Sequence, residues 1–319
     1  MPRLNIYIPD NLDLELRSHP RDINVSKVCA AALRAELSAG SADRTANWLF
    51  TSTFAGPSET DIAVMRRFGL RRCLAGAGWK GKGKEGADSS REYIATVSST
   101  FLDRTFAEGL VVGIAGGLQM WGAVRRLQPR NLGMPMWAIG AGSVDHELPH
   151  VHANALVTFL NLLYAPRAKA MLVGAPHAER AWQYPTMHPP AGQDVKRILV
   201  GSCSPFDADS PYARVLGEDV TNFLVEEHVT GDFLGVFFTP DGRTVEPYPP
   251  GMTVTHVAAA DLRELSARDD TLVVLAAAGG HKTRIIRQVL AARLCNTLIT
   301  DASTAAALLR VTVDESDAD

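Results

Sequence analysis

Apolar runs and amphipathic segments alternate along the chain, and the clearest example lies near the C-terminal end. Residues Thr271 to Ala278 form a continuous apolar run with the length and side chains of a strand buried on both faces. Gly279 and Gly280 follow, where the backbone can turn and another group can approach closely. Apolar residues then recur at helical spacing from Ile285 to Leu294. This pattern predicts a strand, a glycine turn and a helix.

A second apolar run, Thr297 to Thr300, leads to Asp301, which can cap a last helix ending at Leu309. Two strands joined by a helix are expected to lie parallel, because a parallel connection needs a crossover. Ligands of parallel sheets bind beyond the carboxyl ends of the strands. Gly280 and Lys282 are predicted at such an end, where a glycine turn, a helix start and a lysine suit an anion.

The first forty residues carry a different pattern. Residues 3–8 alternate, with Leu4, Ile6 and Ile8 on one face of a predicted strand. Two short amphipathic helices follow, one after Asp10 and one from Val28 to Leu37. A lone strand and two helices cannot bury a core by themselves, whereas two copies could pair their strands and interlock their helices. We therefore expect this segment to dimerise.

The pattern divides the chain into four parts, which are 1–40, a Ser- and Ala-rich linker 41–57, a large α/β domain 58–312 and an acidic end 313–319. Asp61 to Leu70 is predicted to be a short helix before a strand, and the Gly- and Lys-rich residues 79–86 are predicted to be a flexible loop. The acidic end is expected to be disordered.

Composition changes this picture little. With 319 residues, 46% of them hydrophobic and 21% charged, the chain is typical of a globular protein with two domains. Neither a membrane span nor a signal peptide is evident, so we expect a cytoplasmic protein. The four cysteines lack metal-type spacing and are expected to be reduced, and no cofactor or metal is predicted. The net charge of −3 argues against a nucleic-acid coating protein but allows a small DNA-reading module.

The large domain resembles the effector-binding domain of the SorC/DeoR-type bacterial sugar regulators. The resemblance rests on ordered blocks, namely VVGIAGGLQMWGAV from Val111, WAIGAGS from Trp137, HAN from His152, RILVGS from Arg197, VTGDFLGVFFTPDG from Val229, and the segment from Thr271 to Leu309. It implies a mainly parallel α/β sheet, related to the fold of glucosamine-phosphate deaminases, ribose-phosphate isomerases and coenzyme A transferases. It further implies that the protein is a regulator that binds a small sugar or sugar-phosphate effector.

The resemblance also implies which residues hold the ligand. They are Gly116, Gly117, Gln119, Asp232, Gly280 and Lys282. Lys282 would meet an anionic group and Asp232 the sugar hydroxyls, while the amides around Gly117 would complete the cradle. Gln119 stands where the family usually has Thr or Ser, which leaves open whether the ligand is phosphorylated.

The first forty residues, with PRLNIYIPDNL and INVSKVCAAALRAEL, resemble ribbon-helix-helix DNA-binding domains. In that family a two-stranded ribbon formed by two chains enters the major groove. The resemblance implies base contacts by Arg3, Asn5 and Tyr7 and phosphate anchoring by the backbone near Ser26 and Lys27. The partners would be operator DNA and further copies of the chain, as a homodimer or homotetramer. A segment that only dimerises the protein is the alternative.

Other interpretations stay open at this stage. An enzyme of the isomerase or deaminase type would need an acid–base pair, for which Asp232 with His281 or His152 is the candidate. The histidines of DHELPHVH, from Asp145, lack the spacing of a catalytic zinc site and favour a polar loop. Cys203, between two serines after a strand, has no partner that the sequence identifies as an activating base.

Overall fold

The computed structural model describes residues 57–76, 83–139, 149–164, 169–171, 196–208, 213, 216, 218–245 and 257–310, with the backbone only at 83–89 and 169–171. The chain divides into two units, Met1–Gly56 and Pro57–Asp319, and every described residue belongs to the second. The predicted ribbon-helix-helix segment and the acidic end therefore lie outside the described residues. The division into 1–40, 41–57, 58–312 and 313–319 stays a prediction.

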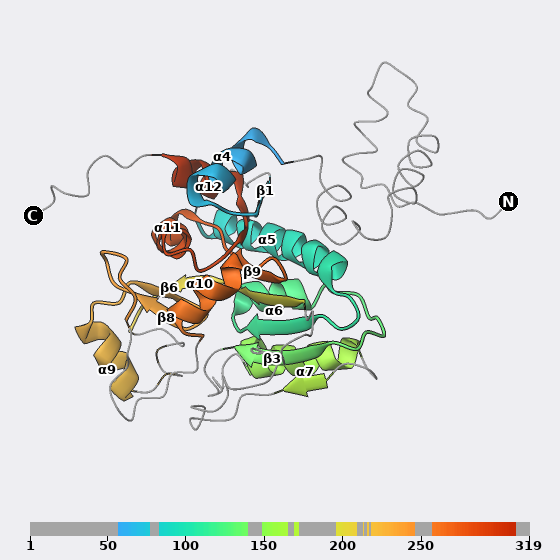
Figure 1. Ribbon diagram of the computed structural model, residues 1–319. Helices are drawn as coiled ribbons and strands as arrows, with labels where there is room; N and C mark the ends of the chain where they lie inside the picture. Colours follow the sequence, from blue (N-terminus) through green and yellow to red (C-terminus); the bar gives the residue numbers. More distant parts are fainter. Residues whose placement is uncertain are drawn as a thin grey trace, which may run out of the picture. The chain divides into compact units, whose positions relative to one another are not determined.

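A seven-stranded sheet, in which every pairing is parallel, forms the centre of the second unit (Figure 1). The strand order is β1-β10-β9-β5-β2-β3-β4. The bounds are β1 Arg72–Gly76, β2 Val111–Ala115, β3 Pro135–Ile139, β4 Lys169–Met171, β5 Arg197–Gly201, β9 Thr271–Ala276 and β10 Thr297–Asp301. Strands β2 and β5 are buried at every residue, as expected of a parallel sheet covered on both faces. The predicted fold class, mainly parallel α/β, is confirmed.

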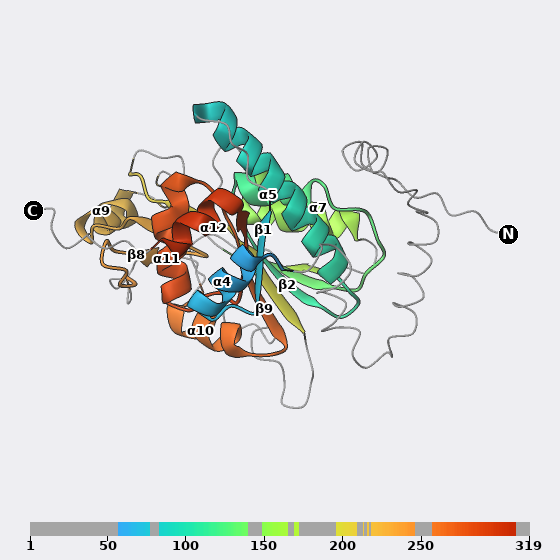
Figure 2. The same cartoon turned by 90° about the horizontal axis from the view of Figure 1, so that it is seen from above.

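Helices cover both faces of this sheet (Figure 2). On one face lie α4 Glu59–Phe68, α10 Ala259–Ala267, α11 Thr283–Ala291 and α12 Ala302–Leu309. On the other lie α5 Gly83–Thr105, α6 Leu118–Val124 and α7 Ala153–Leu163. Neighbouring strand residues point to opposite faces, so that Val273 packs with the first group of helices and Val274 with the second.

The strand order reverses direction between β2 and β5. From β2 the chain proceeds through α6 to β3 and through α7 to β4, and then returns to the other side of β2 as β5, followed outward by β9 and β10. Doubly wound sheets hold their ligands outside the carboxyl ends of the strands at such a reversal. Gly116, after β2, and Ser202, after β5, therefore mark the expected binding crevice.

A small antiparallel sheet continues from the carboxyl end of β5. It consists of β6 Cys203–Pro205, β7 Gly231–Phe233 and β8 Val236–Phe238 in that order. The helix α9, Glu218–Glu226, packs on it through Leu224, which shares a buried cluster with Phe237. Because β6 begins two residues after β5 ends, the antiparallel sheet starts at the carboxyl end of β5, beside Ser202.

Several sequence expectations are confirmed at the level of elements. The apolar runs from Thr271 and Thr297 are strands β9 and β10, and Asp301 caps α12 by accepting a 2.6 Å hydrogen bond from the Thr304 amide. The expected loop at 79–86 is wrong in its second half, because α5 begins at Gly83. Each glycine costs a helix about 1 kcal/mol, which the buried apolar face of a long helix outweighs. No helix among the described residues is long and apolar enough to cross a membrane.

Candidate ligand-binding site

Asp232 lies in the middle strand of the antiparallel sheet, opposite Ser204 of β6 and Phe237 of β8. The β7–β8 hairpin closes through Leu234 and Gly235, both with positive φ (54° and 81°), which is the geometry of a tight two-residue turn. The Gly235 amide donates a 3.3 Å hydrogen bond to Asp232 Oδ2. The turn therefore orients the carboxyl group as well as connecting the strands.

Burial has a large effect on Asp232. Desolvation raises the pKa of its carboxyl group from 3.8 to about 7, although the Gly235 amide and the positive charge of Lys282 both favour the ionised form. The side chain nevertheless keeps part of its surface accessible. A half-buried carboxyl that gains and loses its proton near neutral pH can both donate and accept hydrogen bonds, as sugar hydroxyls require.

Lys282 reaches the same region from the end of β9. Gly279, at φ 111°, turns the chain into the short 3₁₀ helix η3, Gly280–Lys282, which leads into α11. The Gly279 amide is held by the Thr304 hydroxyl at 2.8 Å, which ties this turn to α12. Burial lowers the pKa of Lys282, and the charge of Arg91 lowers it further, while Cys203 and Asp232 act in the opposite direction.

The sequence analysis missed Arg91. This residue lies on α5, and its positive charge lowers the pKa of both Lys282 and His281. Lys282 thus interacts with the positive charge of Arg91 as well as with the carboxyl group of Asp232. The signal that could have located α5 is the spacing of Ile94, Val97 and Phe101, which are buried on its sheet-facing side.

The glycines after β2 form a tightly packed turn. A Cβ atom on Gly116 would lie 2.8 Å from the Val151 carbonyl oxygen, so this position admits only glycine without a backbone shift. Gly117 has φ 115° and precedes α6. Its amide donates a 2.7 Å hydrogen bond to the Val151 carbonyl. The Gly117 amide is therefore already used, and the predicted anion cradle would need other donors; a ligand role for Gly116 and Gly117 stays a prediction.

Gln119 is buried in the first turn of α6 and joins two helices. Its Nε2 donates a 3.3 Å hydrogen bond to the backbone carbonyl of Arg91. The amide side chain thus positions the segment of α5 that carries Arg91, and a direct contact of Gln119 with a ligand stays a prediction. Gly280, in contrast, has open space where a side chain would begin.

Cys203 lies between Asp232 and Lys282 but is fully buried. Burial, with the nearby carboxylate of Asp232, raises the pKa of its thiol to about 12. A thiol that holds its proton at neutral pH is a poor nucleophile, so the residue packs rather than reacts. No group of three or more His, Cys, Asp or Glu side chains suited to a metal occurs among the described residues.

Asp232 and Lys282 interact electrostatically, and Gly280 lies in the same turn as Lys282. That these residues bind one ligand stays a prediction. The structure adds Arg91 and His281. Gly116, Gly117 and Gln119 follow β2, across the reversal in strand order from β5. The DNA-contact candidates Arg3, Asn5, Tyr7, Ser26 and Lys27 all lie outside the described residues.

Comparisons with known proteins agree on the fold. Residues 191–310 match the family model Sugar-bind, described as "Putative sugar-binding domain". A transcriptional regulator from Streptococcus pneumoniae TIGR4 is 18% identical with a TM-score of 0.62, and the match covers 78% of this chain and 95% of that chain. No curated protein sequence matches the chain.

Two further solved structures show the same similarity. The full-length sorbitol operon regulator SorC from Klebsiella pneumoniae is 16% identical with a TM-score of 0.60, covering 95% of this chain and all of that chain (100%). A DeoR family transcriptional regulator from Listeria monocytogenes is 15% identical with a TM-score of 0.60, covering 78% and 98%. The second unit thus has the α/β fold of SorC- and DeoR-type transcriptional regulators, and its residues 191–310 match their sugar-binding domain.

Proposed function

We propose that this protein is a DNA-binding transcriptional regulator whose second unit binds a small sugar-derived effector with an anionic group. The observation that carries the proposal is that Lys282, in the turn that follows β9 of a doubly wound sheet, interacts electrostatically with both Arg91 and Asp232. The matches to sugar-binding regulators support the same function. Operator binding would place the protein in the cytoplasm.

The electrostatics favour an anionic ligand. Arg91 and Lys282 repel each other, and this repulsion contributes to the lowered pKa of Lys282. A phosphate or carboxylate placed between them would remove the repulsion and restore the charged lysine. Asp232, with a pKa of about 7, would then bind the hydroxyls of the same ligand. An anionic sugar suits both parts of the site, because its charge would offset the repulsion between Arg91 and Lys282 and its hydroxyls would bind Asp232.

The ligand prediction can be tested with Lys282→Met, which keeps the length of the stem and removes the charge. Calorimetry against a panel of sugar phosphates and sugar acids should give a ligand for the wild type and at least tenfold weaker binding for the variant. Lys196→Met is the matched control, because Lys196 is an exposed lysine at the opposite end of β5. If no panel member binds the wild type, or if both variants bind a ligand equally well, the proposed site is wrong.

The DNA-binding half of the proposal concerns residues 1–40. We propose that they form a ribbon-helix-helix dimer in which Arg3, Asn5 and Tyr7 read bases, with the intact protein at least dimeric. Arg3→Ala should leave the oligomer intact in light scattering and remove one base contact, worth about 1–3 kcal/mol, from operator affinity. Operator fragments would first be selected from genomic DNA. Wild-type affinity of Arg3→Ala for its selected operator would contradict the ribbon assignment.

Effector and DNA binding are coupled in this proposal. The effector must bind one arrangement of the subunits better than another, because only differential affinity shifts an equilibrium. Lys282→Met should therefore abolish the effect of the ligand on operator affinity while keeping ligand-free DNA binding within about twofold. Loss of DNA binding without ligand would show instead that Lys282 supports the fold.

An enzyme on the same fold is the second candidate, because a carboxyl group with a pKa near 7 suits general acid–base catalysis. Its partner would be His281, whose pKa is lowered by burial and by neighbouring cations, or His152. Proton NMR of each sugar phosphate incubated with the protein distinguishes the two functions. Turnover that Asp232→Asn abolishes would establish the enzyme, and unchanged substrate that nevertheless binds would favour the regulator.

A further inference from the structure

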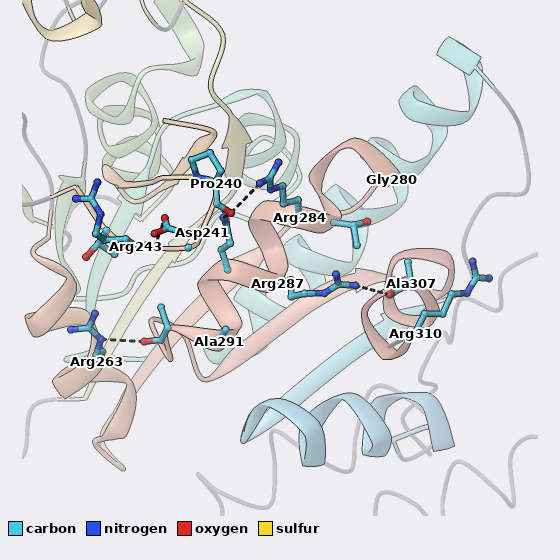
Figure 3. A pocket seen from close by; sticks show the side chains of 15 residues that line it. Pro240, Asp241, Arg243, Arg263, Gly280, Arg284, Arg287, Ala291, Ala307 and Arg310 are labelled. Carbon is cyan, nitrogen blue, oxygen red and sulfur yellow. Dashed lines mark hydrogen bonds between the residues drawn. The ribbon is translucent and has the colours of Figure 1, made fainter. Parts of the chain in front are cut away.

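A concave region lies on the surface formed by α10, α11, α12 and the turn after β8, and Gly280, which the proposed sugar site includes, also lines it (Figure 3). Its volume is about 980 Å³, and it is open to solvent. We name it the arginine groove, after its five arginines Arg243, Arg263, Arg284, Arg287 and Arg310. Asp241 is the one acidic residue among the described residues that line it. Arg243 also forms a 3.2 Å salt bridge with Glu227, which lies outside the lining. Five positive charges, Asp241 and Glu227 together leave a net charge of +3 on this surface.

Hydrogen bonds to backbone carbonyls hold three of these arginines in place. Arg263 donates to Ala292 at 3.2 Å, Arg284 to Pro240 at 3.0 Å and Arg287 to Ala307 at 3.1 Å. Figure 3 shows these bonds as dashed lines, with Arg284 and Arg287 on α11 between the β8 turn and α12. A guanidinium that is already positioned loses little conformational entropy when it binds an anion. The groove is therefore preorganised for an acidic partner.

The chain itself contains a matching segment. Arg310 lines the groove and is directly followed by residues 311–319, which carry Asp314, Glu315, Asp317 and Asp319. These four carboxylates are opposite in sign to the groove, whose net charge is +3. Nine residues reach at most about 30 Å when fully extended, and a short tether gives an effective concentration on the order of millimolar. Attachment at the edge of the groove thus favours this segment over any free acidic peptide.

We propose that the arginine groove is a docking site for the acidic segment 311–319 of the same chain. The groove is open to solvent, which suits a peptide better than an enclosed small molecule. Carboxylates bind guanidinium groups through paired, charge-assisted hydrogen bonds, which gives the interaction its strength and its salt dependence. The proposal does not rest on the identity of the sugar-site ligand, although Gly280 lines the groove and lies in the same turn as Lys282.

The test uses the full chain and a fluorescent synthetic peptide with the sequence of residues 311–319, followed by anisotropy at low salt. A tail-neutral variant removes the carboxylates that would compete with the added peptide and leaves the groove unchanged. Its substitutions are Asp314→Asn, Glu315→Gln, Asp317→Asn and Asp319→Asn. We expect the peptide to bind this variant at least tenfold more tightly than the wild type. Adding Arg284→Gln and Arg310→Gln should weaken peptide binding at least tenfold, whereas adding Arg125→Gln, an exposed arginine of another face, should not.

Three results would overturn the proposal. Equal or undetectable peptide binding by wild type and tail-neutral variant would show that the segment does not occupy the groove. If diluting the wild-type protein raises its affinity for the peptide to that of the tail-neutral variant, the occupant of the groove is the segment of a second copy of the chain. The tail-neutral variant could instead bind duplex DNA of equal charge more tightly than the peptide. If Arg284→Gln and Arg310→Gln abolished that DNA binding, the groove would be a nucleic-acid site. Circular dichroism would show that the variants are folded. Their melting temperatures should agree within about 2 °C, which corresponds to a few tenths of a kcal/mol in the free energy of unfolding.

Discussion

Asp232 is largely desolvated, and this raises the pKa of its carboxyl group, yet part of its side chain stays accessible. Its pKa of about 7 in the folded protein exceeds the unfolded value of about 3.9. Between these values the folded state holds a proton that the unfolded state has lost. Stability therefore falls as the pH rises from about 4 to about 7, and it is constant above that range as far as this group is concerned.

Asp232→Asn should remove this pH dependence. Three pKa units correspond to about 4 kcal/mol, so relative to wild type the variant should gain up to that amount between pH 4.5 and pH 8. Urea denaturation at the two pH values measures the difference. Asp241→Asn is the control, since Asp241 is fully exposed and the Thr239 hydroxyl lowers its pKa, which places its titration below this range. A constant difference between Asp232→Asn and wild type would contradict the raised pKa.

Leu234 shows how an element can hold a strained residue at the edge of a site. A non-glycine residue at φ 54° costs about 1 kcal/mol, and Asn-Gly is the preferred pair in such a turn. The side chain of Leu234 is only 2% exposed, however, and fills the space above Gly201, where a Cβ atom would lie 2.5 Å from its Cδ2. Removing a buried leucine costs about 2–5 kcal/mol, so packing outweighs strain.

We therefore expect Leu234→Asn to destabilise the protein by about 1–3 kcal/mol, despite its better turn propensity. Because the hairpin orients Asp232, ligand affinity should fall as well. Urea denaturation and calorimetry measure the two effects. A variant as stable as wild type would show that turn strain, and not core packing, determines the conformation of this hairpin.

The sequence predicted elements better than it predicted contacts between them. The runs from Thr271 and Thr297 identify their strands, since continuous apolar residues fit a sheet buried on both faces. The pairing of Asp232 with Ser204 joins residues far apart in the chain, and no local pattern encodes that register. Arg91 was missed for the same reason. Its role depends on where α5 crosses the sheet, and its own neighbours in sequence do not reveal this.

At the scale of the molecule, the second unit contains everything that its own core needs. Helices from within residues 57–310 cover both faces of the parallel sheet, and buried clusters fill the space between the helices and the sheet. The same residues supply Arg91, Asp232 and Lys282. Within the described residues, the buried clusters and the candidate site draw on 57–310. We therefore predict that the second unit folds and binds its ligand alone.

The chain that begins at Pro57 should therefore unfold in a single cooperative transition and bind the ligand of the intact protein with a Kd within about threefold. It should lose operator binding completely, because the proposed ribbon lies in residues 1–40. Urea denaturation, calorimetry and an operator-binding titration measure the three properties. Retained operator affinity would move the DNA-binding surface into the second unit, where the arginine groove, with its five arginines, would be the first place to examine. Lost ligand binding by a folded second unit would show instead that the first unit or the oligomer completes the site.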